Sequence, residues 1–108
     1  MSKVKGKAEA KKLVNKYVKQ LKEAQYPFKS VYLFGSYAKN KAHKWSDIDV
    51  AVITNQVKNY NEKNRLKLWE LRNNVDLRIQ PISFTEKDFK DINDPMVWEV
   101  KTTGEKVA

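Results

Sequence analysis

Apolar side chains recur every three or four positions near the start of the chain. These positions are Ala10, Leu13, Val14, Tyr17, Val18, Leu21 and Ala24, and most of the residues between them are lysines or other polar residues. Because an α-helix brings such positions onto one face, the pattern predicts an amphipathic helix over residues 8–25. One side of this helix is expected to pack on a core.

Two short apolar runs then predict neighbouring β-strands. Residues 30–34 are β-branched and aromatic and are followed by Gly35, which is typical of a buried strand. Residues 47–53 are apolar at consecutive positions toward their end, so both faces of this second strand are expected to be covered. We therefore place the second strand in the centre of a sheet, with a polar loop between the two strands.

The next segments predict a helix and a third strand. Over residues 62–73 the helical spacing turns Leu66, Leu68 and Trp69 toward the core. Residues 75–79 alternate between apolar and polar side chains, the pattern of a strand with one buried face.

Prolines and hydroxyl residues mark the remaining boundaries. Pro81 is expected to end the third strand, and Ser83 or Thr85 to cap a short helical turn after it. Pro95 suits the first position of a last helix through about residue 101, with Gly104 as its end.

The order of these elements predicts a small α/β (α+β) fold in which helices flank a mixed sheet. The chain has 108 residues, and 41% of them are hydrophobic, which is enough for one core and too little for two. We therefore expect residues 1–108 to form a single domain.

Composition narrows the chemistry. With no cysteine, thiolate metal sites, disulfides and cysteine nucleophiles are excluded. No apolar stretch approaches the roughly 20 residues that span a bilayer, so a soluble, cytoplasmic protein without a membrane partner is expected. The formal charge of +9 fits an anionic small molecule or an acidic partner as well as it fits nucleic acid.

Two carboxylates stand out on the second strand. Asp47 and Asp49 are two residues apart, so their side chains leave the same face of a strand. Like charges on an apolar strand are costly unless a cation lies between them, and oxygen ligands of this kind suit Mg²⁺. If the third strand lies beside the second, Asp76 joins them, and three acids are enough to hold two Mg²⁺ ions.

The turn after the first strand offers a complementary site. Gly35 lets the backbone approach a ligand closely, and the N–H groups of the turn, with the Ser36 hydroxyl, suit phosphate oxygens. Ten residues separate Ser36 from Asp47, so the loop returns to the mouth of the adjacent strand.

Together these residues resemble the signature of the DNA polymerase β-like nucleotidyltransferase superfamily. The signature combines a Gly-Ser pair, ten intervening residues, an Asp-Ile-Asp triplet and a later aspartate. Residues 33–38 and 45–49 are most similar to the minimal nucleotidyltransferases, many of which are encoded beside HEPN-domain partners as toxin–antitoxin pairs. The resemblance covers residues 31–79, and Asn40 departs from it where the family often has Gly.

The resemblance implies a polymerase β palm-like nucleotidyltransferase fold with its catalytic core at about residues 30–80. It implies a Mg²⁺-dependent enzyme, with two ions, that moves a nucleoside monophosphate, AMP being the best fit, from ATP or another NTP to an acceptor hydroxyl. The residues carried over are Asp47, Asp49 and Asp76 as catalytic metal ligands, and Gly35, Ser36 and Ser46 as nucleotide-binding residues.

The resemblance also suggests a biological role. An antitoxin of this type would bind a HEPN ribonuclease partner and nucleotidylate it, with adenylylation of a tyrosine as the best fit. The alternatives are a catalytically weak antitoxin that acts by binding alone, or a nucleotidyltransferase with a small-molecule or nucleic-acid acceptor. A homo-oligomer stays open, and direct nucleic-acid binding through the lysine-rich first helix is less favoured.

Overall fold

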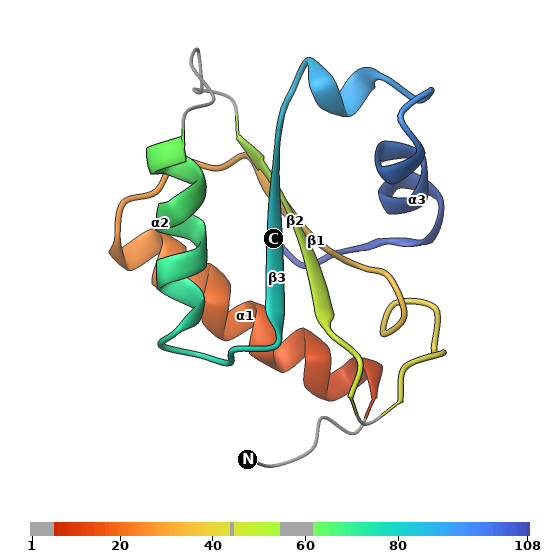
Figure 1. Ribbon diagram of the computed structural model, residues 1–108, viewed down its shortest axis with the longest axis horizontal. Helices are drawn as coiled ribbons and strands as arrows, with labels where there is room; N and C mark the ends of the chain where they lie inside the picture. The colour runs from red at the N-terminus through yellow and green to blue at the C-terminus, as the bar shows by residue number, and fades with distance from the viewer. Residues whose placement is uncertain (1–5, 44, 55–61) are drawn as a thin grey trace.

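Four strands form one mixed sheet with helices on both faces (Figure 1). The computed structural model describes residues 6–43, 45–54 and 62–108. In chain order the elements are α1 (Lys7–Glu23), β1 (Ser30–Phe34), β2 (Ile48–Thr54), α2 (Glu62–Arg72), β3 (Ile79–Thr85), the 3₁₀ helix η1 (Asp88–Lys90), α3 (Pro95–Thr103) and β4 (Glu105–Lys106).

The sheet has the strand order β3-β2-β1-β4. β1 pairs antiparallel with both β2 and β4, whereas β2 and β3 run parallel with α2 as their crossover. β2 is therefore an inner strand, as its apolar run predicted. All of its residues except Asp49 are buried.

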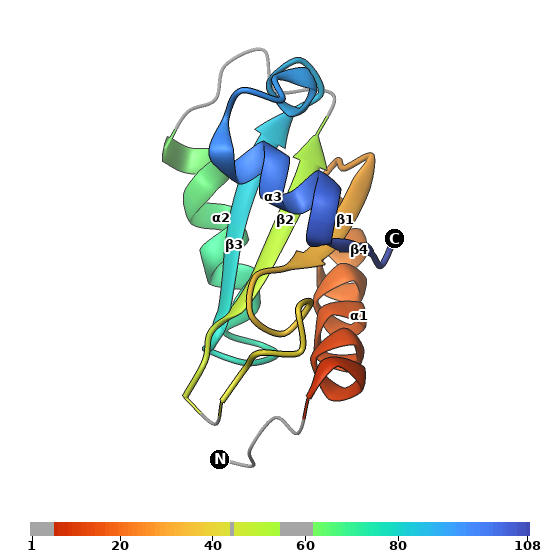
Figure 2. The ribbon, with the colours of Figure 1, turned by 90° about the vertical axis from the view of Figure 1, so that its right-hand side faces the viewer.

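Alternation along the strands divides the core into two layers. Helices α1 and α2 cover one face of the sheet, where Val50 and Val52 pack with Leu33 of β1 and Tyr17 of α1. On the opposite face, Ala51, Ile53 and Phe34 pack with α3 (Figure 2). Asp49 has the same parity as Ala51 and Ile53, so its side chain is placed on the α3 face.

Several predicted elements are confirmed. The first helix, the first strand and the last helix lie within two residues of their expected bounds. The Asp94 side chain accepts a hydrogen bond from the Met96 backbone N–H, and Pro95 occupies the first turn of α3, whose C-cap is Gly104. Thr85, rather than Ser83, receives the N–H at the start of η1, through the 3.0 Å bond from Asp88.

The predicted third strand at residues 75–79 is wrong. Those residues form turns until β3 begins at Ile79, and Pro81 lies inside β3 instead of ending it. An edge strand needs hydrogen bonds on one side only, so the missing N–H of a proline is tolerated there. The polar and apolar alternation of residues 75–79 therefore belongs to a turn.

The inward face of α2 was also predicted incorrectly in part. Leu68 and Leu71 are buried, whereas Leu66 is 58% exposed and Trp69 is half-buried. The apolar stripe of this helix is narrow, with positions three residues apart contacting the core.

Among the described residues, no helix is long and apolar enough to cross a membrane.

A buried hydrogen bond joins the two helices of one layer. The Tyr17 hydroxyl of α1 donates to the Leu68 carbonyl of α2 over 2.8 Å. We expect Tyr17→Phe to lower the free energy of unfolding by about 1 kcal/mol, because the fold loses a buried bond while keeping the ring. Urea denaturation measures this change.

Tyr37→Phe is the matched control. Tyr37 is equally buried, and within the described part of the chain its hydroxyl has no hydrogen-bond partner. Removing that hydroxyl should leave the stability unchanged or raise it. Equal losses in the two variants would contradict the role given to the Tyr17 bond.

Candidate active site

The paired aspartates lie where β1 and β2 meet the loop that joins them. Asp49 is the second residue of β2 and is paired with Phe34, the last residue of β1. Asp47 is exposed and immediately precedes β2. The loop after β1, described at residues 35–43, 45 and 46, therefore leaves and re-enters the sheet beside these carboxylates, below α3 in Figure 2.

Gly35 lies directly against the Asp49 carboxylate. Its φ is +77°, a left-handed conformation that favours glycine. A Cβ added at this position would fall far inside van der Waals contact with Asp49 Oδ2. The structure therefore has both conformational and steric reasons for glycine at position 35, and the predicted Gly-Ser and Asp-Ile-Asp motifs are in contact.

The loop after Gly35 is closed by its own backbone. The Lys39 N–H donates to the Gly35 carbonyl over 3.1 Å, and the Lys41 N–H donates to the Ser36 carbonyl over 2.9 Å. Asn40 has a φ of +56°, so Asn supports the left-handed turn where the family often has Gly.

The first residues of this loop carry hydrogen-bond donors that can bind a ligand. Among the described residues, nothing accepts from the backbone N–H groups of Ser36 and Tyr37, and the half-buried Ser36 hydroxyl has no partner. Successive N–H groups of this kind form an anion-binding concavity. The geometry is therefore compatible with the phosphate role predicted for Gly35 and Ser36.

The site is short of positive charge. Burial first, then the charges of Asp47 and Glu99, raise the pKa of Asp49 to about 6, while Lys39 acts in the opposite direction. Three carboxylates thus face one ammonium group. An added divalent cation would relieve this repulsion.

Three residues beside Asp49 were not predicted. Lys39, from the loop, and Glu99, from α3, form an ion pair with 2.8 Å between Nζ and Oε1. The parallel register of β2 and β3 also places Gln80 beside Asp49. The ion pair joins residues 60 positions apart, and the place of Gln80 depends on the strand register. Neither follows from a local pattern, so the lysines of the loop were the one signal that the sequence offered.

Asp76 is not brought to this cluster as predicted. It lies in the turn before β3, where its side chain accepts from the Arg78 backbone at 2.8 Å and forms a 3.2 Å ion pair with the Arg78 guanidinium. Burial raises the pKa of Asp76, but the hydrogen bonds and charge of Arg78 outweigh burial and lower it. Within the described ranges, no group of three acids or histidines is arranged to hold a metal ion.

Ser46 has a local role in the structure. It is buried, and its Oγ accepts the His43 backbone N–H over 2.9 Å, while its own N–H donates to the His43 carbonyl over 2.9 Å. These two bonds fix the loop just before Asp47. The hydroxyl proton of Ser46 remains available to a further acceptor.

The donor set fits Mg²⁺. Asp47 and Asp49 supply two carboxylates, one exposed and one half-buried. Mg²⁺ commonly takes one or two carboxylates from a protein and completes its shell with waters and phosphate oxygens. The third protein ligand expected from Asp76 is not required by this coordination.

The Gly35 contact yields a testable consequence. We expect Gly35→Ala to displace the Asp49 carboxylate, lower the free energy of unfolding by about 1–3 kcal/mol, and abolish the rise in melting temperature caused by Mg²⁺ with ATP. Gly6→Ala is the control, because Gly6 also has a positive φ of 121° but nothing within 4 Å of an added Cβ. A Gly35→Ala protein that kept the full ligand-induced shift would contradict this packing.

The raised pKa of Asp49 predicts that removing its charge stabilises the fold at neutral pH but not in acid. The folded state holds this proton up to about pH 6, whereas the unfolded state loses it near pH 4, so ionisation destabilises the fold as pH rises through this window. We expect Asp49→Asn to raise the free energy of unfolding at pH 7 by on the order of 1 kcal/mol after solvent screening, and to have little effect at pH 3.5.

Chemical denaturation at the two pH values measures this difference, with the exposed Asp88→Asn as the control. A destabilised Asp49→Asn protein at pH 7 would show that the carboxylate is compensated by cations in the fold.

Comparison with known proteins places this geometry in a family. The nucleotidyltransferase domain pattern matches residues 14–102, most of the chain. The chain is 31% identical over 77 residues to the "Probable protein adenylyltransferase MntA" of Haemophilus influenzae, an alignment that covers 69% of this chain and 68% of that protein.

A second relative and a solved structure support the same family. The Methanocaldococcus jannaschii protein MJ0126, provisionally named a protein adenylyltransferase, is 41% identical over 66 residues, and the match spans 61% of this chain and 61% of that relative's length. A crystal structure of a toxin-antitoxin with AMP-PNP superposes with a TM-score of 0.65 at 25% identity, covering 87% of this chain and 71% of the other. The α/β fold, the paired motifs and the match over residues 14–102 together show that the chain belongs to the nucleotidyltransferase domain family.

Proposed function

We propose that this chain is a Mg²⁺-dependent adenylyltransferase that transfers AMP from ATP to a hydroxyl group of a protein partner. The observation that carries the proposal is the contact between Gly35 and the Asp49 carboxylate. It joins a phosphate-binding turn and a metal-binding pair at one point. The named relatives, protein adenylyltransferases, support AMP and a protein acceptor.

Each proposed residue has a task that follows from its position. Asp47 and Asp49 hold Mg²⁺, which when bound neutralises the phosphates and the developing charge of the reaction. The N–H groups after Gly35 and the Ser36 hydroxyl bind phosphate oxygens, and Ser46 holds the loop that carries Asp47.

In the reaction the oxygen of the acceptor hydroxyl forms a bond to the α-phosphorus of ATP, and the hydroxyl proton passes to solvent. The bond from this phosphorus to the bridging oxygen breaks, and pyrophosphate leaves. The chain contributes mainly by orienting these groups and by holding the charges that neutralise the phosphates, as is general for phosphoryl transfer. Lys39 lies close enough to Asp49 to add a positive charge beside the phosphates.

We also propose that the acceptor belongs to a HEPN-domain toxin and that the chain is its antitoxin, acting in the cytoplasm. A structural neighbour is a toxin-antitoxin assembly, which supports this type of partner. Two large aromatic side chains also lie open to solvent: Trp45 is 75% exposed and Trp98 is 53% exposed. Exposed tryptophans are enriched where proteins bind one another.

Label transfer tests the activity. The chain, Mg²⁺ and ATP labelled at the α-phosphate are incubated with a HEPN-domain protein of the same genome. We expect label on the partner, and a loss of about 10²–10³-fold in Asp47→Asn and in Asp49→Asn, because each removes charge stabilisation from the transition state. Exposed Asp88→Asn should retain full activity.

The same assay decides the role of Asp76. If its pairing with Arg78 is purely structural, Asp76→Asn lowers stability and leaves the rate per folded molecule within about threefold of wild type. A loss as large as that of Asp47→Asn would establish Asp76 as the third ligand. Absence of label with every HEPN candidate, but neutralisation by the Asp47→Asn/Asp49→Asn protein, would favour an antitoxin that acts by binding alone.

A further inference from the structure

A pocket lies at the other end of the sheet from the aspartates. It has a volume of about 350 Å³, and its lining includes four lysines, Lys29, Lys90, Lys101 and Lys106, with the rings of Tyr32 and Phe89. We call it the basic pocket. None of its lining residues belongs to the candidate active site.

Strand geometry separates the two sites. Ile53 of β2 lines the basic pocket and is four residues beyond Asp49, which places it about 13 Å away along the strand. In Figure 1, η1 is at the top of the molecule and the yellow loop that follows β1 is at the lower right. A ligand of the basic pocket therefore does not occupy the phosphate turn.

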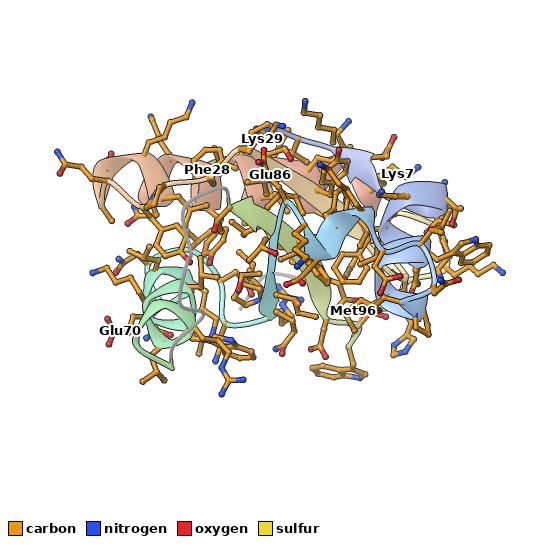
Figure 3. All side chains as sticks on the ribbon, turned by 90° about the horizontal axis from the view of Figure 1, so that it is seen from above. Lys7, Phe28, Lys29, Glu70, Glu86 and Met96 are labelled. Atoms are coloured by element: carbon orange, nitrogen blue, oxygen red, sulfur yellow. The ribbon has the colours of Figure 1, made fainter. Side chains whose placement is uncertain are left out.

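Charge in the basic pocket is strongly unbalanced. The lysines come from four separate segments: the residue before β1, η1, α3 and β4. Among the described lining residues Glu86 is the only acid, and it forms an ion pair of 2.7 Å with Lys29. Figure 3 labels these two side chains, which lie close together in the view from above. For Lys90, Lys101 and Lys106, the described part of the chain provides no ion pair.

Three lysines without an ion pair among the described residues line this pocket, and an anion bound there would be attracted by all of them. Lysines that serve only to keep a surface solvated do not need to line a pocket. The pocket therefore combines a positive rim with a shape that can enclose part of a ligand, and its volume is at the lower end of small-molecule sites, roughly 300–1,000 Å³.

Aromatic rings give the basic pocket its apolar part. The ring centroids of Tyr32 and Phe89 are 5.5 Å apart, and Phe84 supports Phe89 at 6.1 Å. Lys101 Nζ lies 4.8 Å from the centroid of Phe89. This contact holds the ammonium at the pocket without neutralising its charge.

We propose that the basic pocket binds a nucleoside monophosphate unit, either as a free nucleotide or as part of a single-stranded RNA. The lysines receive the phosphate, and the Tyr32–Phe89 pair receives the flat base. Lysines beside aromatic rings are the combination by which proteins bind single-stranded nucleic acid. This ligand is additional to the ATP proposed for the aspartate site.

Calorimetric titration of the whole chain with AMP in EDTA tests the proposal, because chelation removes the cation required at the aspartates. We expect Lys90→Ala/Lys101→Ala to weaken AMP binding by about tenfold or more. The matched control is Lys12→Ala/Lys67→Ala, which removes two exposed lysines from α1 and α2 and should bind as wild type.

A short single-stranded RNA distinguishes the two sources of the ligand. If the natural ligand is RNA, affinity increases from AMP to a pentanucleotide, and Lys90→Ala/Lys101→Ala reduces the slope of log affinity against log salt by about 1.4. If it is a free nucleotide, the pentanucleotide binds no tighter than AMP.

Three results would overturn the proposal: no AMP or RNA binding, AMP binding that is unchanged in the lysine variant, or an acidic peptide that binds as tightly as AMP. These results do not depend on AMP transfer to a partner, so failure of the proposed enzymatic function is distinguishable from failure of this inference.

Discussion

The close approach of Gly35 to the Asp49 carboxylate is the contact on which the candidate active site depends. It exists because antiparallel pairing sets Phe34 opposite Asp49, so that the next residue of β1 turns across the carboxylate. Any larger residue at position 35 would push β1 and β2 apart or rotate the acid away. The loop, the paired acids and the ion pair from α3 are all positioned relative to this one point.

The local parts of this arrangement were predictable from the sequence. Helix α1 is marked by its helical spacing of apolar residues and strand β1 by its short apolar run. Helix α3 is bounded by Asp94 and Gly104. Strand β3 was not predictable in the same way, because Pro81 suggests an end and only the position of the strand at the sheet edge makes it acceptable. Edge position is a property of the whole sheet.

The same distinction between local patterns and long-range arrangement applies to the candidate site. The Gly-Ser and Asp-Ile-Asp motifs are short, and the return from β1 to β2 brings them together, so their spacing predicted that they lie at neighbouring strand ends. Glu99 reaches Lys39 from 60 residues away, and the strand register gives the place beside Asp49 to Gln80. The alternating pattern around Asp76 suggested a strand, whereas its ion pair with Arg78 stabilises a turn.

Pro81 also limits how another protein can approach the molecule. It interrupts the hydrogen-bonding groups of β3 at the outer edge of the sheet, and β4 at the opposite edge has only two residues. Proteins that recruit an extended peptide as an extra strand need a continuous row of free backbone groups. Neither edge offers one, so recognition of a folded partner must use side chains on the helical faces and loops.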